Sequence, residues 1–413
     1  MDIVIRYHDI ERWKKVGKRV LVYGRRKTGN SFFIKNFTNY DEYFFVKRDR
    51  GIIDIKNNRE ISYDYLKDLI LREKDKRIVI DEFHRLPEDF LDFLHAYGEN
   101  LNLILISSTL WFSKKLLSKS SPILGIFEEF KIDLINEIDI LKNLMNEEGK
   151  EFIEKGIYLR EPWIIPLVKD NIVDSLVKIL KEQKYTISNL IGEIFLEEDK
   201  IFKETYYTIL TAIASDKAKS SEISSFLFNR KIIEKDDPSI IQSYLKTLEE
   251  IGLIEKIKIL NKNYYQYKII SPLLDLYFYL IGKYGYTEID INDEEIKRVI
   301  NEKISYHVED FFRKLLSQIY GLKYGKITEK DFEVDIVLYS FNDIKVVGEV
   351  KWKNNIDKDE IKRIENNLNK FNCRKILIVP DKNNLEYIPE NIEIIDTNKI
   401  KEIIKNYNFS TEF

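Results

Sequence analysis

Eight consecutive residues have the types and spacing needed to hold a phosphate group: Gly24, Arg25, Arg26, Lys27, Thr28, Gly29, Asn30 and Ser31. The glycines let backbone N–H groups converge on an anion, and the helix expected from the following sequence FFIKNF adds positive potential at its N-terminus. The Ser31 hydroxyl can bind Mg²⁺. The spacing matches the phosphate-loop pattern G-x-x-x-x-G-K-[ST], except that Asn30 stands where the pattern has lysine.

This asparagine changes the chemistry expected of the loop. Asn30 can donate a hydrogen bond but carries no charge, and the loss of one charge-assisted contact costs roughly 1.5–3 kcal/mol, or about one to two decades of affinity. Lys27, Arg25 or Arg26 could supply the missing charge, although nothing in the sequence requires it. We therefore expect the loop to bind ATP or ADP, with weak or absent hydrolysis.

Two further segments carry residues that a nucleotide site needs. Asp81 and Glu82 follow the apolar run from Arg77 to Ile80, where Asp81 would hold Mg²⁺ through water and Glu82 would polarise the attacking water. Ser108 follows a later apolar run and could act as a polar sensor of the terminal phosphate. Each segment alone could be an ordinary turn at a strand end, but their order along the chain favours a nucleotide site.

A second group of chemically capable residues lies near the C-terminus. Because side chains alternate along a strand, Glu349 and Lys351 share one face, and a hairpin with the strand FEVDIVLYS would bring Asp335 beside them. Asp335 and Glu349 can hold Mg²⁺ or Mn²⁺, Lys351 can position or activate a water, and Glu309 on a preceding helix can extend the metal shell. The alternative is a solvated ladder of opposite charges.

Five short apolar runs separated by helical or polar segments must position the first group. They are Arg19 to Tyr23, Glu42 to Val46, Arg77 to Ile80, Leu101 to Ile106 and Phe130 to Leu134. Continuous apolar strands that alternate with helices indicate a parallel sheet covered on both faces. The sequence therefore predicts the α/β fold class.

The middle of the chain has a different pattern. From Ile138 to about Lys203 it is helical, and Arg160 there is expected in a surface ion pair. Three helical segments then precede two strands around the turn Asn261-Lys262-Asn263, with a serine N-cap at SSEISSFLF and a helix end at Gly252. This order predicts a winged helix, whose wing residues Lys256, Lys258 and Lys262 could contact DNA. Packing or self-association is the alternative role.

Composition bounds the class of protein. The 413 residues suffice for two or three domains, and the formal charge of −3 excludes a protein that coats nucleic acid by bulk charge. Cys373 is the only cysteine, which excludes disulfides within the chain and indicates a reducing interior. No apolar run approaches the roughly 20 residues of a membrane helix. We expect a cytoplasmic protein with no membrane partner.

The segments GRRKTGNS, VIDEFHRLP and LILISSTLWF together resemble an archaeal family of P-loop ATPases of the STAND/AAA-like group. This resemblance implies a helical lid over the nucleotide and, after the winged helix, a C-terminal domain of the PD-(D/E)xK nuclease type, which the spacing D-x₁₃-E-x-K also resembles. The family pattern places an arginine where this chain has Ile126. Asn30 and Ile126 together favour a degenerate ATPase.

These inferences divide the chain into a P-loop ATPase core (1–137), a helical lid (138–203), a winged helix (204–285), a linker (286–300) and a nuclease-like domain (301–413). The resulting hypothesis is a nucleotide-sensing domain that controls a metal-dependent nuclease-like domain acting on nucleic acid, DNA more than RNA. The alternative is a catalytically inactive scaffold that binds DNA or protein. Self-association of the chain is left open.

Overall fold

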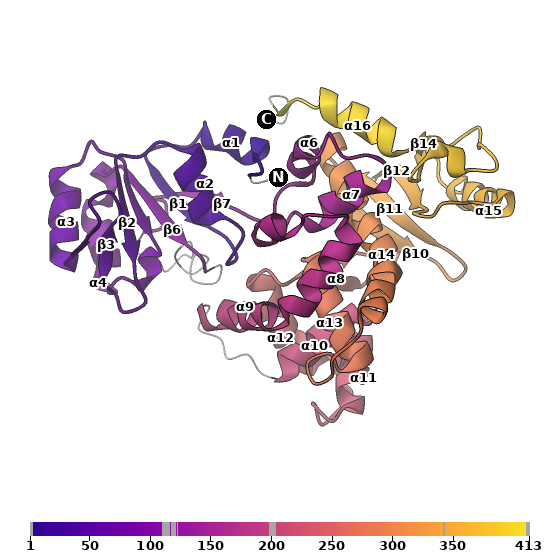
Figure 1. Ribbon diagram of the computed structural model, residues 1–413, viewed down its shortest axis with the longest axis horizontal. Coiled ribbons are helices and arrows are strands. Elements are labelled where there is room, and N and C mark those ends of the chain that lie inside the picture. The colour runs from indigo at the N-terminus through magenta and orange to yellow at the C-terminus, as the bar shows by residue number, and fades with distance from the viewer. Residues whose placement is uncertain are drawn as a thin grey trace.

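The computed structural model describes residues 3–109, 116, 121, 123–197, 204–341 and 343–409. Figure 1 shows an N-terminal α/β lobe beside a larger body formed by the rest of the chain. The lobe contains a seven-stranded sheet in the order β4-β3-β2-β5-β6-β1-β7. Its strands are β1 (Arg19–Tyr23), β2 (Glu42–Val46), β3 (Ile52–Asp54), β4 (Arg59–Ile61), β5 (Ile78–Asp81), β6 (Leu103–Ser107) and β7 (Glu128–Lys131).

The predicted parallel sheet is confirmed. The strands β2, β5, β6, β1 and β7 run parallel, and β3 and β4 extend the sheet antiparallel at the β2 edge. Alternate strand residues face two separate apolar cores, so both faces of the sheet are buried. The covering helices are α1 (Tyr7–Trp13) and α2 (Asn30–Phe37) on one face, and α3 (Tyr63–Arg72) and α4 (Asp89–Tyr97) on the other.

The predicted bounds of the fifth strand were wrong. The strand covers Glu128–Lys131 and not Phe130 to Leu134, because Glu128 to Lys131 are in register with β1, and beyond them Ile132 N–H adds one hydrogen bond to the backbone oxygen of Tyr23. The apolar residues that follow lie in other buried positions. Ile132 lies in the core under α2, and Leu134 lies near the larger body. The apolar run from Phe130 to Leu134 therefore predicted buried residues correctly, but it did not predict where the strand ends.

The larger body begins with helices, as predicted for residues 138–203. They are α6 (Glu137–Asn143), α7 (Gly149–Tyr158), the 3₁₀ turn η3 (Pro162–Leu167), α8 (Ile172–Glu182) and α9 (Lys184–Glu197). Next come α10 (Glu204–Ala214), α11 (Ser220–Asn229), α12 (Pro238–Glu250), the hairpin strands β8 (Ile254–Lys258) and β9 (Tyr265–Ile269), and α13 (Pro272–Tyr284). Three helices followed by a hairpin are thus present in the expected order.

Local signals in this region were partly right. Gly252 has φ +73° and follows the end of α12 as expected, since glycine adopts this left-handed conformation without a steric penalty. The serine N-cap at α11 was wrong: Lys219 holds that position, and the Glu222 carboxylate accepts hydrogen bonds from the backbone N–H groups of Ala218 and Lys219. The Glu222 carboxylate in the first turn thus satisfies the N–H groups of the N-cap residue and of the residue before it.

The C-terminal part contains a five-stranded sheet in the order β10-β11-β12-β13-β14. Its elements are α14 (Asp293–Tyr320), β10 (Lys323–Thr328), β11 (Glu333–Ser340), β12 (Asp343–Val350), α15 (Lys358–Leu368), β13 (Arg374–Ile378), β14 (Glu393–Ile395) and α16 (Thr397–Asn406). Strands β10, β11 and β12 are antiparallel, whereas β12, β13 and β14 are parallel.

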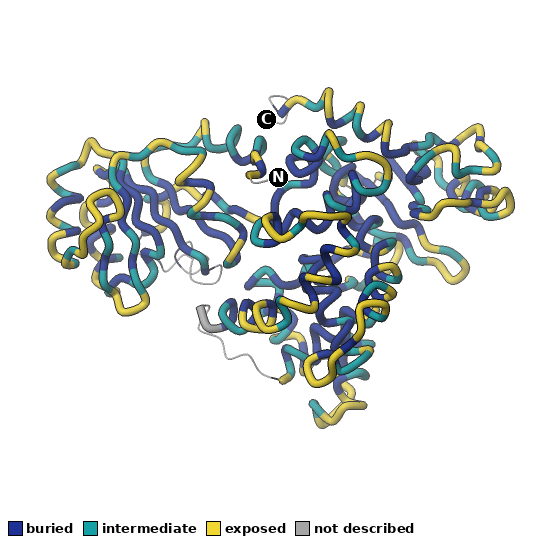
Figure 2. Tube along the Cα trace, viewed as in Figure 1, coloured by how far each residue is buried: buried dark blue, intermediate teal, exposed yellow. Residues whose placement is uncertain are grey.

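One continuous apolar core joins the parts of the larger body. It runs from α6–α8 through α10–α14 to the C-terminal sheet and α16, and Figure 2 shows stretches of buried chain within these segments. The predicted linker 286–300 contains the first eight residues of the long helix α14, because α14 begins at Asp293. Among the described residues, no helix combines the length and the apolar character needed to cross a bilayer.

Candidate functional site

The phosphate loop connects β1 to α2 at the carboxyl edge of the parallel sheet. Gly24 must be glycine, since a Cβ atom there would collide with the backbone oxygen of Ile132. Gly29, the N-cap of α2, has φ +99°, which favours glycine as well. Lys27 is exposed and has a left-handed backbone with φ +68°. The loop therefore has the tight path that a phosphate cradle requires.

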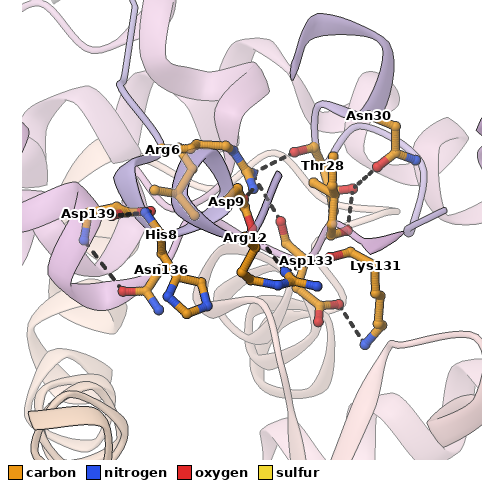
Figure 3. A network of polar contacts seen from close by, with 12 residues as sticks. Arg6, His8, Asp9, Arg12, Thr28, Asn30, Lys131, Asp133, Asn136 and Asp139 are labelled. Carbon is orange, nitrogen blue, oxygen red and sulfur yellow. Dashed lines mark hydrogen bonds and ion pairs between the residues drawn. The ribbon is translucent and has the colours of Figure 1, made fainter. Parts of the chain in front are cut away.

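Asn30 points into the loop instead of outward (Figure 3). Its Nδ2 donates to the backbone oxygens of Gly24 and Ser107, each at 3.3 Å, and its side chain is buried. The Thr28 hydroxyl donates to the backbone oxygen of Arg25 at 2.6 Å and lies 3.3 Å from Asn30 Oδ1. Both side chains form hydrogen bonds within the loop and stabilise it. The predicted contacts of Thr28 and Asn30 with a nucleotide would therefore be made by their backbone atoms.

Two loop arginines are held by acids of the larger body. Arg25 Nη2 lies 2.7 Å from Glu161 Oε1, and the two side chains are 5% and 1% exposed. Because a buried guanidinium without its partner would be strongly destabilising, Arg25 stays with Glu161 and is unsuited to replace the lysine. Arg26 forms an ion pair with Glu193 of α9 at 2.8 Å and is more exposed.

Asp81 ends strand β5 at the same edge of the sheet. Its Oδ2 accepts a hydrogen bond from the Tyr43 hydroxyl at 2.6 Å, and its Oδ1 has no hydrogen-bond partner among the described residues. Burial raises the pKa of Asp81, while Tyr43, Ser31 and Lys35 oppose that shift. An unpaired buried carboxylate oxygen beside a serine hydroxyl fits the ligand chemistry of Mg²⁺.

Glu82 and Ser108 lie together, as their predicted roles require. The Ser108 hydroxyl donates to Glu82 Oε2 at 2.9 Å, and the same oxygen lies 3.5 Å from both His84 Nδ1 and Arg85 Nη2. Glu82 has φ +59°, a strained conformation for a residue with a side chain. Both residues line a pocket of about 670 Å³ together with Gly29, Asn30 and Ser31.

Two sequence interpretations change here. Arg160 forms an ion pair with Glu137 at 2.7 Å, as expected, but both side chains are at most 10% exposed, so the pair is buried and not on the surface. Ile126 lies at the opposite edge of the sheet from the phosphate loop, since its backbone oxygen accepts from Arg19 at the start of β1. An arginine at position 126 would therefore not reach the phosphate loop of its own chain.

The C-terminal carboxylates meet as the hairpin predicted. Strands β11 and β12 pair with Ile336 opposite Gly348, which places Asp335 beside Glu349. Asp335 Oδ2 accepts from the Val350 backbone N–H at 3.0 Å, and Lys351 Nζ lies 2.7 Å from Glu349 Oε1. The Glu349 and Lys351 side chains are 17% and 22% exposed, so this is not a solvated ladder of charges.

These carboxylates repel one another. Burial, followed by the charge of Asp335, raises the pKa of Glu349 to about 7, and the same two causes raise the pKa of Glu309 to about 7. Burial acts to lower the pKa of Lys351, but Glu349, Asp335 and Glu309 outweigh it and raise that pKa. A cation is therefore favoured here, although no three acidic, histidine or cysteine side chains of the described chain converge as a ready metal site.

Two of the three predicted wing lysines are less available than the sequence suggested, whereas Lys258 is exposed. Lys256 pairs with Glu249 at 2.6 Å, and Lys262 lies 3.9 Å from Glu329 of the C-terminal part. The turn itself is docked, because the Asn261 side chain donates to the backbone oxygen of Thr328 at 3.1 Å. Leu260 N–H also donates to the backbone oxygen of Lys326 at 2.9 Å. The hairpin packs against the C-terminal sheet, the second role considered above.

Sequence reasoning missed the residues that support both sites. Glu161 and Glu193 hold the loop arginines, and Arg313 donates to the backbone oxygen of Asp335 at 2.9 Å while pairing with Asp310 at 3.0 Å. The charged residues of EDFFRK, spaced three and four apart between apolar positions, were an available signal for the second support. No local pattern marks Glu161 or Glu193, whose partners are more than a hundred residues away.

No protein-family model and no curated protein matches this chain. Among solved structures, the Walker-type ATPase paby2304 of Pyrococcus abyssi is 18% identical, with a TM-score of 0.46 over 67% of this chain and 96% of its own. The ORC2 protein of Aeropyrum pernix, in ADPNP–ADP complexes, is 11% identical, with a TM-score of 0.37 over 73% and 94%. The ORC1 protein of Aeropyrum pernix in complex with DNA is 12% identical, with a TM-score of 0.28 over 70% and 96%.

Proposed function

We propose that the N-terminal lobe binds ATP or ADP together with Mg²⁺. The observation that carries this proposal is one pocket at the carboxyl edge of a parallel sheet, lined by the loop residues Gly29, Asn30 and Ser31 and by the Glu82–Ser108 pair, with Asp81 directly before Glu82 at the end of β5. Ligands of open α/β sheets bind in the crevice outside the carboxyl ends of the strands. The N-terminus of α2 points into this crevice and favours an anion.

Each residue has a defined task in this proposal. The backbone N–H groups of Gly29, Asn30 and Ser31 would donate to phosphate oxygens, and Ser31 and Asp81 would hold Mg²⁺, which neutralises phosphate charge when bound. Glu82 would orient a water toward the terminal phosphate. Because Asn30 brings no charge to the transferring phosphoryl group, we propose that hydrolysis is weak or lost while binding is retained.

Calorimetry with ATP and Mg²⁺ tests this function. We expect the unsubstituted chain to bind ATP. The Asn30→Lys variant should bind ATP about 10- to 100-fold more tightly, since one charge-assisted contact is added. Turnover gained by Asn30→Lys should disappear when Glu82→Gln is added. If neither the natural chain nor Asn30→Lys binds ATP or ADP, the nucleotide function is wrong.

A second candidate activity is favoured by the pairing of Asp335 with Glu349 and of Glu349 with Lys351. We propose that this group acts on nucleic acid, DNA more than RNA, as a metal-dependent nuclease-like site. Asp335 and Glu349 would hold Mg²⁺ or Mn²⁺, with Glu309 extending the metal shell, and the bound cation would lower the pKa of a bound water and neutralise phosphate charge. Lys351 would position that water, because its ammonium already lies against Glu349.

Incubation with single- and double-stranded DNA and RNA in Mn²⁺ tests the second activity. We expect cleavage that chelation removes and that Glu349→Gln lowers by about 100-fold or more, since removal of one carboxylate weakens the metal site. Lys345→Ala, an exposed lysine on the same strand, is the matched control and should cleave normally. Metal-independent binding without cleavage, unchanged in Asp335→Ala, would instead support the inactive scaffold.

A further inference from the structure

The pocket in front of the phosphate loop is lined by more positive charge than the loop pattern contains. Its wall includes five cationic side chains, Arg26, Lys27, Lys47, Arg48 and Arg85, and a single carboxylate, Glu82. A concave site with this excess of one sign concentrates field lines and attracts a polyanion. Three of the five cations, Lys47, Arg48 and Arg85, come from outside the loop.

Arg26 and Arg48 meet at one carboxylate. Arg26 Nε lies 2.8 Å from Glu193 Oε2, and Arg48 Nη2 lies 3.4 Å from Glu193 Oε1. Arg26 belongs to the loop, Arg48 follows strand β2, and Glu193 is on α9 of the larger body. An anionic group of this chain thus bridges two guanidinium groups beside the pocket in which the phosphates would lie.

Two residues of the loop, Asn30 and Arg25, cannot supply this charge. Asn30 is turned inward to the backbone oxygens of Gly24 and Ser107, and Arg25 is buried against Glu161. Guanidinium groups recognise phosphate oxygens in a bidentate manner, which a lysine ammonium does not.

We propose that Arg26 and Arg48 bind the terminal phosphates of a nucleoside triphosphate in place of the missing lysine. In the nucleotide-free chain the Glu193 carboxylate occupies their guanidinium groups, and it is displaced when the nucleotide enters. The Arg48 and Glu193 side chains are 61% and 36% exposed, so water screens their attraction and a phosphate of higher charge can replace the carboxylate. This inference rests on the proposed nucleotide function.

Calorimetry on the full chain, with ATP and Mg²⁺ and separately with AMP, tests the proposal. We expect Arg48→Ala and Arg26→Ala each to weaken ATP affinity by about tenfold, because one charge-assisted contact is lost, and to leave AMP affinity unchanged. Glu193→Gln should tighten ATP binding by roughly two- to fivefold. Arg72→Ala, which removes an exposed arginine from α3, is the matched control and should bind as the natural chain does.

The outcomes separate this proposal from the nucleotide function itself. If the natural chain binds ATP and both arginine variants bind it equally well, the assignment of Arg26 and Arg48 is overturned while the nucleotide function stands. If Glu193→Gln weakens ATP binding, Glu193 supports the bound state and the displacement is overturned. If no variant binds any nucleotide, including Asn30→Lys, both proposals fail. Thermal unfolding of each variant checks that the chain is folded.

Discussion

At the scale of single residues, buried and hydrogen-bonded polar groups hold the phosphate loop in place on the side that faces the larger body. Figure 3 shows Arg6, whose guanidinium donates to the backbone oxygen of Thr28 at 2.7 Å and to that of Asp133 at 3.0 Å. In the same network the backbone N–H of His8 donates to the Asp139 carboxylate at 3.1 Å. The loop is therefore tied from behind to helix α6 of the larger body.

Asp139 should make stability depend on pH. Burial raises the pKa of Asp139 to about 8, and the repulsion of Asp9 adds to that shift, while His8 N–H, Arg6 and Lys142 oppose it. Because the folded pKa lies above the unfolded value, the folded chain binds the extra proton, and its stability falls as pH rises from about 4 to about 8. Asp139→Asn removes this loss and keeps an oxygen for the His8 N–H.

The predicted gain for Asp139→Asn is on the order of 5 kcal/mol at pH 8, shrinking toward zero near pH 4. Denaturant unfolding across that range measures it. Asp68→Asn, on the exposed side of α3, checks that loss of a surface negative charge does not reproduce the effect. Equal gains at pH 4 and pH 8 would contradict the assignment to Asp139.

At the scale of elements, the sequence predicts the strands that are buried on both faces, but it does not predict contacts between residues that are far apart in the chain. The strands Arg19–Tyr23 and Glu42–Val46 were predicted with their observed bounds, because fully buried parallel strands are continuous apolar runs between polar segments. Strands β3 and β4 were not predicted. Each has only three residues, and two residues of β4 are exposed, so neither strand gives a periodic signal in the sequence. The order of the segments along the chain assigned Glu82 and Ser108 to one predicted nucleotide site, whereas no pattern in the sequence pointed to Glu161 or Glu193.

Helix α14 begins within the predicted linker. The acidic segment that begins α14 was interpreted as a spacer because of its charge, yet Asn292 caps it and Asp293, Glu294 and Glu295 lie in its first turn, where acids stabilise a helix. Farther along, α14 buries Asp310, Arg313 and other charged residues that only tertiary partners can accommodate. One helix thus carries the Glu309 carboxylate and packs against the middle helices.

At the scale of the whole molecule, the N-terminal lobe and the larger body have separate apolar cores, and they are joined by polar contacts and by Tyr7 of α1, which packs against the core of the body. The two cores of the lobe do not merge with the core of the body. Between them lie the Arg6 network and the Arg25–Glu161 pair, in which both side chains are almost fully buried. A nucleotide in the loop would therefore act on the body through groups attached directly to that loop.

The last prediction concerns this junction. Glu161→Gln leaves the Arg25 guanidinium buried without an opposite charge, which should destabilise the folded chain by about 3 kcal/mol. The loss should fall on the N-terminal lobe, since Arg25 is part of its loop, so calorimetric unfolding should shift the transition of the lobe more than that of the body. Lys181→Ala, which breaks the exposed Lys181–Asp293 pair, should change stability by less than about 1 kcal/mol. A Glu161→Gln variant as stable as this control would mean that the buried pair does not hold the lobe to the body.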